Sequence, residues 1–352
     1  MTDAAQTGQR RLPRRALVAV VLLGIGGSLA AVQAAQTMRD SPDARPDIAA
    51  AGQPFLPYSS DSFFRSTLEG APIDRAATAS FRSFMREHRD QDEHDYPMIR
   101  GVGRNRWGTV YAEGRASDPV WRLTGRVPRE VSELRTRGFH APDWLGEALT
   151  RTSDSPFVVV DRASGWSVWA AKAKEVGPQL IRVGAAGLFE HESNGLDRRN
   201  PRSDSQVNYR SRGAIPDAMV IRRDLVAYAK ATDGDLGHVL HMFFVETNSA
   251  DGFVHPMVGE ESGKDGWGAA GERIAVGPEV DLSARDCSPE ALVIARTLQR
   301  HGAYLGDNSA QGTGLKAEQE TEFTSWRGRL SADELAGCIR WDDFVVIEPG
   351  WQ

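Results

Sequence analysis

The stretch PFVVVDRASGWSVWAA, residues 156–171, decides the fold class of this 352-residue chain. Two apolar runs, 157–161 and 166–170, flank the turn residues Ser164-Gly165. Such runs around a short turn that contains glycine are typical of a β-hairpin. The same signal recurs further along the chain, and we predict strands at 180–183, 238–247, 272–276 and 344–347.

Helical periodicity is limited to short segments, of which 289–301 is the clearest. Ser288 is its expected N-cap, Pro289 lies in its first turn and Gly302 ends it. Other short helices are predicted at 75–88, 128–137, 143–149, 223–230 and after Ser331. Because alternating βαβ units are missing, the pattern indicates a mostly β fold with several short helices, specifically a β-sandwich of jelly-roll-like topology.

An uncharged apolar run at 16–32 follows four arginines near the N-terminus. Positive charge before such a run directs the rest of the chain across the membrane. Residues 1–35 are therefore predicted to be a signal peptide or a membrane anchor, and the run is short enough to leave both alternatives open. We expect a disordered linker at 36–54. A single extracytoplasmic domain follows at 55–352, either secreted or held at the cytoplasmic membrane by the N-terminal helix.

Cys287 and Cys338 are the two cysteines of the chain. In an oxidising compartment an isolated pair most simply forms a disulfide, and the alternative is a pair of buried thiols. The formal charge of −6 argues against a nucleic-acid partner. The sequence lacks a nucleophile elbow, a phosphate-binding loop, a zinc-protease motif and an EF-hand loop, so no cofactor and no metal site is expected.

His238 and His241 have the spacing of a metal-binding pair on a helix, but they fall in a predicted strand. Residues three apart in a strand face opposite sides, so the two cannot bind one ion. His238 opens the strand after a Gly-rich turn, where side chains reach ligand clefts. The alternative for each is a hydrogen-bonded histidine of the core.

Tyr304, Asp307 and Asn308 follow the predicted 289–301 helix. A tyrosine with a histidine can abstract and return a proton at a uronic acid, which is lyase chemistry. An aspartate with a second carboxylate is instead the pair that a glycoside hydrolase uses. The alternative is a buried tyrosine hydroxyl bonded to a turn aspartate. The candidate catalytic residues are thus His238, Tyr304 and Asp307.

Several of the nine tryptophans, Trp169 among them, fall near turns or strand ends. Aromatic faces at such places commonly stack on sugar rings, whereas core packing is the alternative. Arg222 and His191 are further candidate contacts for anionic or hydroxyl groups of a substrate. The substrate-binding candidates are therefore Arg222, His191 and Trp169.

Several segments resemble a family of exported bacterial proteins, common in actinobacteria, that has no established activity. The resemblance spans most of the region from 55 to 320 and rests on Pro57–Ser62, Asp154–Asp161, Gly237–Leu240, Ile294–Gln299, His301–Tyr304 and Asp307-Asn308. It implies a secreted β-rich domain associated with carbohydrate, and it selects His238, Tyr304 and Asp307. This chain departs from the family pattern at Val239, where alanine is usual, and in a longer loop at 191–214.

The sequence therefore predicts an exported or membrane-anchored protein of the cell envelope that binds or processes polysaccharide. The expected partner is a polysaccharide or cell-wall glycan, together with the membrane if the N-terminal helix is retained. The alternative is a non-catalytic surface module that binds a protein or a cell-wall polymer.

Overall fold

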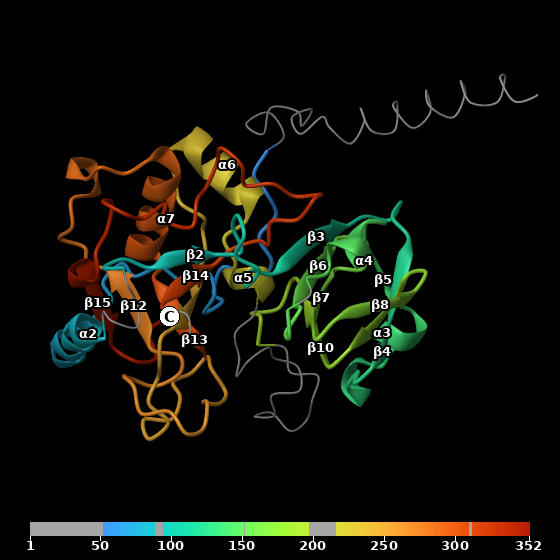
Figure 1. The fold of residues 1–352 in the computed structure, drawn as a ribbon, viewed down its shortest axis with the longest axis horizontal. Helices are drawn as coiled ribbons and strands as arrows, with labels where there is room; N and C mark the ends of the chain where they lie inside the picture. Colours follow the sequence, from blue (N-terminus) through green and yellow to red (C-terminus); the bar gives the residue numbers. More distant parts are fainter. Residues whose placement is uncertain (1–51, 89–93, 151, 197–215, 310–311) are drawn as a thin grey trace, which may run out of the picture. The chain divides into compact units, whose positions relative to one another are not determined.

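The computed structural model describes residues 52–88, 94–150, 152–196, 216–309 and 312–352. This part of the chain belongs to one compact unit. Its strands form three sheets, which confirms the prediction of a β-rich fold (Figure 1). The predicted signal or anchor segment at 1–35, and most of the predicted linker, lie outside the described residues. Among the described residues, no helix is both long and apolar enough to span a membrane.

The largest sheet has seven strands in the order β1-β15-β12-β13-β11-β14-β2. Their bounds are β1 Ile73–Asp74, β2 Met98–Arg100, β11 Leu240–Phe244, β12 Arg273–Val276, β13 Ala303–Asn308, β14 Gly314–Lys316 and β15 Phe344–Ile347. The sheet is mixed, since β11 runs parallel to β13 and antiparallel to β14. Strand β11 is short and fully buried, which fits a central strand covered on both faces.

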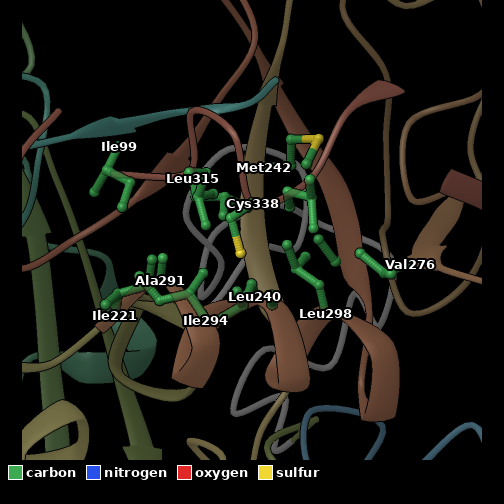
Figure 2. Close-up of a cluster of buried hydrophobic side chains, with 14 of the residues drawn as sticks. Ile99, Ile221, Leu240, Met242, Val276, Ala291, Ile294, Leu298, Leu315 and Cys338 are labelled. Carbon is green, nitrogen blue, oxygen red and sulfur yellow. The ribbon is translucent and has the colours of Figure 1, made fainter. Parts of the chain in front are cut away.

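Three helices contribute to the apolar core on one face of this sheet, α2 (Arg75–Glu87), α6 (Arg223–Thr232) and α7 (Pro289–Arg300). Helix α7 begins as predicted, because the Ser288 side chain accepts a hydrogen bond from Ala291 N and Pro289 lies in the first turn. Side chains of the sheet and of α7 meet in this core (Figure 2): Leu240, Met242, Leu315, Ala291, Ile294 and Leu298.

The predicted hairpin forms as β6 (Phe157–Asp161) and β7 (Trp166–Ala171), which pair antiparallel. Gly165 has a φ of 77° in the connecting turn, a conformation that glycine adopts without steric cost. Strands β10 (Ala185–Glu190) and β3 (Val110–Gly114) complete this four-stranded sheet. A third sheet contains β5 (Phe139–His140), β4 (Val120–Gly125), β9 (Leu180–Val183) and β8 (Lys174–Gly177).

The two four-stranded sheets share a core that includes Trp121, Phe139 and Phe157. The remaining short helices are η1 Arg129–Val131, α3 Glu133–Thr136, α4 Leu145–Ala148, α5 Pro216–Met219, η3 Leu282–Ala284 and η4 Trp341–Asp343. The predicted helix at 128–137 is thus divided between η1 and α3. After Ser331 the predicted capping contact to Glu334 is present, but the chain forms turns instead of a helix.

The topology differs from the predicted jelly roll. A jelly roll is built from antiparallel strands, whereas four neighbouring pairs here are parallel: β11 with β13, β14 with β2, β3 with β6, and β4 with β9. Between β11 and β13 the chain passes through β12 and α7, and such a long crossover allows parallel neighbours. The predicted strand at 238–247 is also shorter, because Val239 N donates to Phe64 O outside the sheet.

The second face of the seven-stranded sheet is also covered. A separate apolar cluster joins it to the β10-β7-β6-β3 sheet, and its members include Tyr111, Val158, Trp169, Val239 and Tyr304. The predicted disulfide is confirmed: Cys287 and Cys338 are bonded, with their Cα atoms 4.6 Å apart. The candidate site lies on this second sheet face.

Candidate functional site

Five adjacent strands each place one polar residue in a single row on the second sheet face. The registers pair Arg273 with Tyr304, Tyr304 with His241, and Lys316 with Arg100. His241 faces Lys316 by continuation of the antiparallel register of β11 with β14. We call this set the polar row, and its members are Arg273, Tyr304, His241, Lys316 and Arg100. Each is at most 4% exposed, so the row is an unusually polar layer inside the protein.

A β-bulge directs Asp307 to the same face as the polar row. The register of β11 with β13 shifts after Met242, so that Phe243 faces Asp307 and Gly306 is the extra residue. Side chains alternate along a strand, and without the extra residue Asp307 would point to the helix-covered face. Bulges commonly re-aim a side chain near a functional site.

A cavity of about 260 Å³ opens beside Asp307 and Phe243. Arg100 at the end of the polar row lines it, and so do residues from five other segments of the chain: Trp107, Asp154, Phe243, Glu261, Asp307, Asn308 and Ser309. The volume is slightly below the range of about 300–1,000 Å³ typical of pockets for drug-sized ligands. The cavity therefore suits one sugar residue or a group of similar size.

Hydrogen bonds fix the acidic side of the cavity. Asn308 N lies 3.5 Å from Glu261 Oε1, so the Glu261 carboxylate is held beside the end of β13. Asn308 Oδ1 accepts a hydrogen bond from Thr247 N at 2.8 Å. Ser249 Oγ donates to the Glu261 carbonyl oxygen. The loop that carries Glu261 is thereby attached to the strand that carries Asp307.

The basic side of the cavity comes from the sheet. The Arg100 Nη2 atom donates to Gly312 O at 3.1 Å. The Lys316 ammonium lies 4.6 Å from the centroid of the Phe243 ring, and Phe243 in turn lines the cavity. A cation over an aromatic face is attracted by the ring quadrupole. One wall of the cavity therefore carries positive charge, while Asp154, Glu261 and Asp307 supply carboxylates.

His238 does not line the cavity. Its side chain is buried, and its Nδ1 atom lies 2.9 Å from Val239 O. Burial lowers the pKa of His238 to about 4, and the nearby charges of His301 and Arg222 act in the same direction. The imidazole is therefore neutral near pH 7, and its Nε2 atom has no hydrogen-bond partner among the described residues.

Tyr304 lies in the polar row but does not reach the cavity either. The Arg273 guanidinium lies 5.4 Å from its ring centroid. Burial raises the pKa of Tyr304, and Arg273 offsets part of that rise. Of the three predicted catalytic residues, only Asp307 lines the cavity.

Arg222 is fully buried and contacts strand β3, helix α6 and the segment at Phe55. It forms an ion pair with Asp224, lies 3.4 Å from the Glu113 carboxylate and donates to Phe55 O at 2.6 Å. Burial opposes its charge, but Tyr111, Asp224 and Glu113 outweigh burial and raise the pKa of the guanidinium. Through these contacts the guanidinium of Arg222 has a structural role in the fold.

His191 and Trp169 are likewise in the interior, at 7% and 3% exposure. His191 Nε2 lies 3.1 Å from Ser167 Oγ, and burial together with Arg162 lowers the pKa of His191 to about 4. Trp169 belongs to the apolar cluster between the sheets. The structure therefore brings none of the three predicted substrate-binding residues to the cavity.

Sequence reasoning missed Arg100 and Glu261, and it covered Trp107 only through the general expectation for tryptophans near turns. Arg100 ends a strand of three residues, which is too short to give a periodic signal. Glu261 lies in a long polar loop, where the sequence offered no spacing to another carboxylate. Within the described residues no cluster of three or more potential ligands is arranged to hold a metal ion.

A larger groove of about 710 Å³ is lined by the segments 103–106, 147–150 and 319–322. It contains no residue that the sequence analysis selected. Four of its five charged lining residues, Arg104, Arg106, Glu147 and Glu322, are exposed to solvent, and the fifth, Glu320, is half-buried. The smaller cavity, with its buried arginine, is the better candidate site.

Comparisons of this chain with protein-family models, curated proteins and solved structures found no match. The resemblance to a family of exported bacterial proteins stays a prediction.

Proposed function

We propose that this protein is an exported cell-envelope protein that binds polysaccharide and hydrolyses it at the cavity beside Asp307. The observation that carries the proposal is the presence of Asp307 and Glu261 in one small cavity with Trp107. Glycoside hydrolysis uses two carboxyl groups, one to donate a proton and one to act as base or nucleophile. The aromatic face of Trp107 offers a surface for a sugar ring.

Export is part of the same proposal. The disulfide between Cys287 and Cys338 is consistent with an oxidising compartment outside the cytoplasm. The charged and then apolar N-terminal sequence supports a signal peptide or a membrane anchor. A polysaccharide of the envelope is the substrate that such a location offers.

The test is a screen of the purified chain against bacterial and plant polysaccharides, with release of reducing ends as the readout. We expect Asp307→Asn and Glu261→Gln each to lower the rate by at least about 100-fold. Glu260→Gln is the matched control, because Glu260 is exposed and does not line the cavity. Thermal unfolding of each variant checks that the fold is intact. Wild-type rates in both cavity variants would contradict the proposal.

A second candidate function is a non-catalytic module that binds a glycan. It is favoured by the burial of His238 and Tyr304 away from the cavity, so that neither of these predicted acid–base groups is among the described residues that line it. Binding without any product, weakened by Trp107→Ala by about fivefold, would select this function. Absence of both binding and product across the panel would overturn the carbohydrate proposal as a whole.

A further inference from the structure

Residues 55–68 form neither helix nor strand, yet they run from one large sheet to the other. We call this segment the strap (blue in Figure 1). Three backbone hydrogen bonds attach it: Tyr58 N to His191 O at 2.7 Å, Val239 N to Phe64 O at 2.8 Å, and Leu68 N to Arg300 O at 2.8 Å. The three partners lie just after β10, just before β11 and at the end of α7. The strap is thus held by hydrogen bonds to elements that are distant in the sequence.

Two side chains of the strap, Tyr58 and Phe64, are buried in the apolar cluster between the two sheets. The same cluster contains Tyr111 and Trp169. The Tyr111 hydroxyl and the Trp169 Nε1 atom are buried and have no hydrogen-bond partner among the described residues. A buried donor without a partner is costly, and contact with water removes that cost. The closed strap is therefore less stable than its apolar contacts alone would make it.

His191 packs directly against the strap. Its ring centroid lies 5.1 Å from that of Phe55, and its Nε2 atom lies 3.1 Å from Ser167 Oγ. Burial lowers the pKa of His191 to about 4, and the Arg162 charge acts in the same direction, whereas Asp161 opposes both. His191 is therefore neutral over a pH range in which an exposed imidazole becomes charged.

His238 lies between two points of contact with the strap. On one side of it, a Cβ atom on Gly237 would lie 3.0 Å from Leu56 Cδ1. On the other side, Val239 N donates to Phe64 O. The His238 side chain itself is 2% exposed. Solvent can therefore reach this imidazole only after a local rearrangement, and displacement of the strap is one that removes both neighbouring contacts.

Three ionisable side chains face His238 from other elements: Arg222 before α6, Asp235 before β11 and His301 at the end of α7. Burial lowers the pKa of His238 to about 4, with His301 and Arg222 acting in the same direction. The hydrogen bond to the Val239 carbonyl and the Asp235 charge oppose this change. Burial disfavours the charge of Asp235 too, but His301 and the other hydrogen bonds lower its pKa to about 2. Asp235 is therefore ionised in mild acid.

The two lowered pKa values make the closed strap sensitive to pH. In an open form, both imidazoles would regain their ordinary pKa of 6.5. Between about pH 6.5 and pH 4 the open form therefore binds more protons than the closed form, and the closed form loses stability as pH falls. Each new imidazolium would also face a cation, Arg162 beside His191 and Arg222 beside His238. Both histidines thus act in the same direction.

We propose that the strap is an acid-released cover, which leaves the molecule when His191 and His238 take up protons in mildly acidic surroundings. Its departure withdraws Tyr58 and Phe64 from the cluster between the sheets and lets water reach Tyr111. The release is local, because the core on the other sheet face, which contains α7, does not include these side chains. This inference does not depend on the proposed polysaccharide function.

The experiment measures amide hydrogen exchange of the purified chain at about pH 7.5 and about pH 5, corrected for the intrinsic exchange rate at each pH. We expect the protection of residues 55–68 to fall by at least about tenfold on acidification, while α7 keeps its protection. Each histidine contributes up to about 30-fold if opening restores its ordinary pKa. Equal loss of protection in the strap and in α7 would indicate acid unfolding of the whole protein and would overturn the inference.

The double variant His191→Gln and His238→Gln should make the protection of the strap independent of pH, because glutamine cannot take up a proton. His88→Gln is the matched control, since His88 ends α2 and stacks on Phe84, and it should keep the wild-type pH dependence. Should the double variant fail to fold, the comparison of the strap with α7 in the wild-type chain still decides the question. Unchanged protection of the wild-type strap, or a pH dependence that survives in a folded double variant, would contradict an acid-released cover.

Discussion

Glu272 is a carboxyl group whose surroundings disfavour its charge. It directly precedes β12, and burial raises its pKa to about 7, with further contributions from the Asp74 and Asp251 carboxylates. Between about pH 4.5 and pH 7 the folded protein therefore holds a proton that the unfolded chain has released. A state that binds more protons is favoured at low pH, so this residue lowers the stability of the fold as pH rises through that window.

Replacement of Glu272 by glutamine should remove this pH dependence, because the amide cannot ionise. Relative to the wild type, the free energy of unfolding of Glu272→Gln should increase from about pH 4.5 to pH 7 and then level off. Urea unfolding at a series of pH values measures the difference. Glu279→Gln serves as a control, since Glu279 is exposed. Parallel curves for wild type and Glu272→Gln would contradict the argument.

The residues of the candidate site were only partly predictable. Asp307 could be selected from the sequence because it follows a clearly predicted helix and lies close to Tyr304 and Asn308, so that several side chains capable of catalysis occur together. Arg100 and Glu261 could not be selected, because their positions beside the cavity depend on contacts between segments that are distant in the sequence. His238 was expected to open the central strand, but its neighbour Val239 bonds to Phe64 O, a contact that sequence periodicity cannot reveal.

At the scale of elements, the bulge in β13 decides which side chains meet. The heptapeptide Ala303–Ser309 alone would suggest simple alternation, with Tyr304 and Asp307 on opposite faces. The extra residue Gly306 places both on the same face. Whether a strand bulges depends on its partner strand, and this is why the orientation of Asp307 could not be predicted from the sequence.

Local signals were more reliable for helix α7, whose N-cap is determined within a few residues. The Ser288 hydroxyl accepts a hydrogen bond from Ala291 N and also donates to the Glu334 carboxylate. We expect Ser288→Ala to lower the free energy of unfolding by about 1 kcal/mol. Ser132, which precedes α3 and makes no capping bond through its side chain, gives the matched control Ser132→Ala. Equal effects of the two changes in urea unfolding would argue against the cap.

At the scale of the whole molecule, the order of strands in the seven-stranded sheet could not be read from the sequence. Neighbours β11 and β13 are more than fifty residues apart, and β2 joins β14 across more than two hundred residues. The strand signals in the sequence indicate that β-structure is present. The pairing of the strands depends on which faces of the sheet are covered by helices and which by the second apolar cluster. The β-rich fold class was thus predictable from the sequence, whereas the predicted jelly-roll topology is wrong.

The disulfide is a long-range connection that could be predicted from the sequence, and its contribution to the stability of the fold can be measured. Cys287 precedes α7, and the buried Cys338 lies 51 residues later, in a turn before η4. The bond therefore restrains the segment that packs on the first turn of α7. On the chain-entropy model a loop of this length stabilises the fold by about 4 kcal/mol. The combined change Cys287→Ala and Cys338→Ala should lower the free energy of unfolding by that amount in urea.

The reduced wild-type protein is the control for the loss of the cysteine side chains, because reduction breaks the bond and keeps both residues. Reduced wild type and the double variant should unfold at similar urea concentrations, both well below the oxidised protein. Since Cys338 is fully buried, a double variant much less stable than the reduced protein would mean that packing of the sulfur dominates. If reduction left the unfolding midpoint unchanged, the bond would have no role in the stability of the fold.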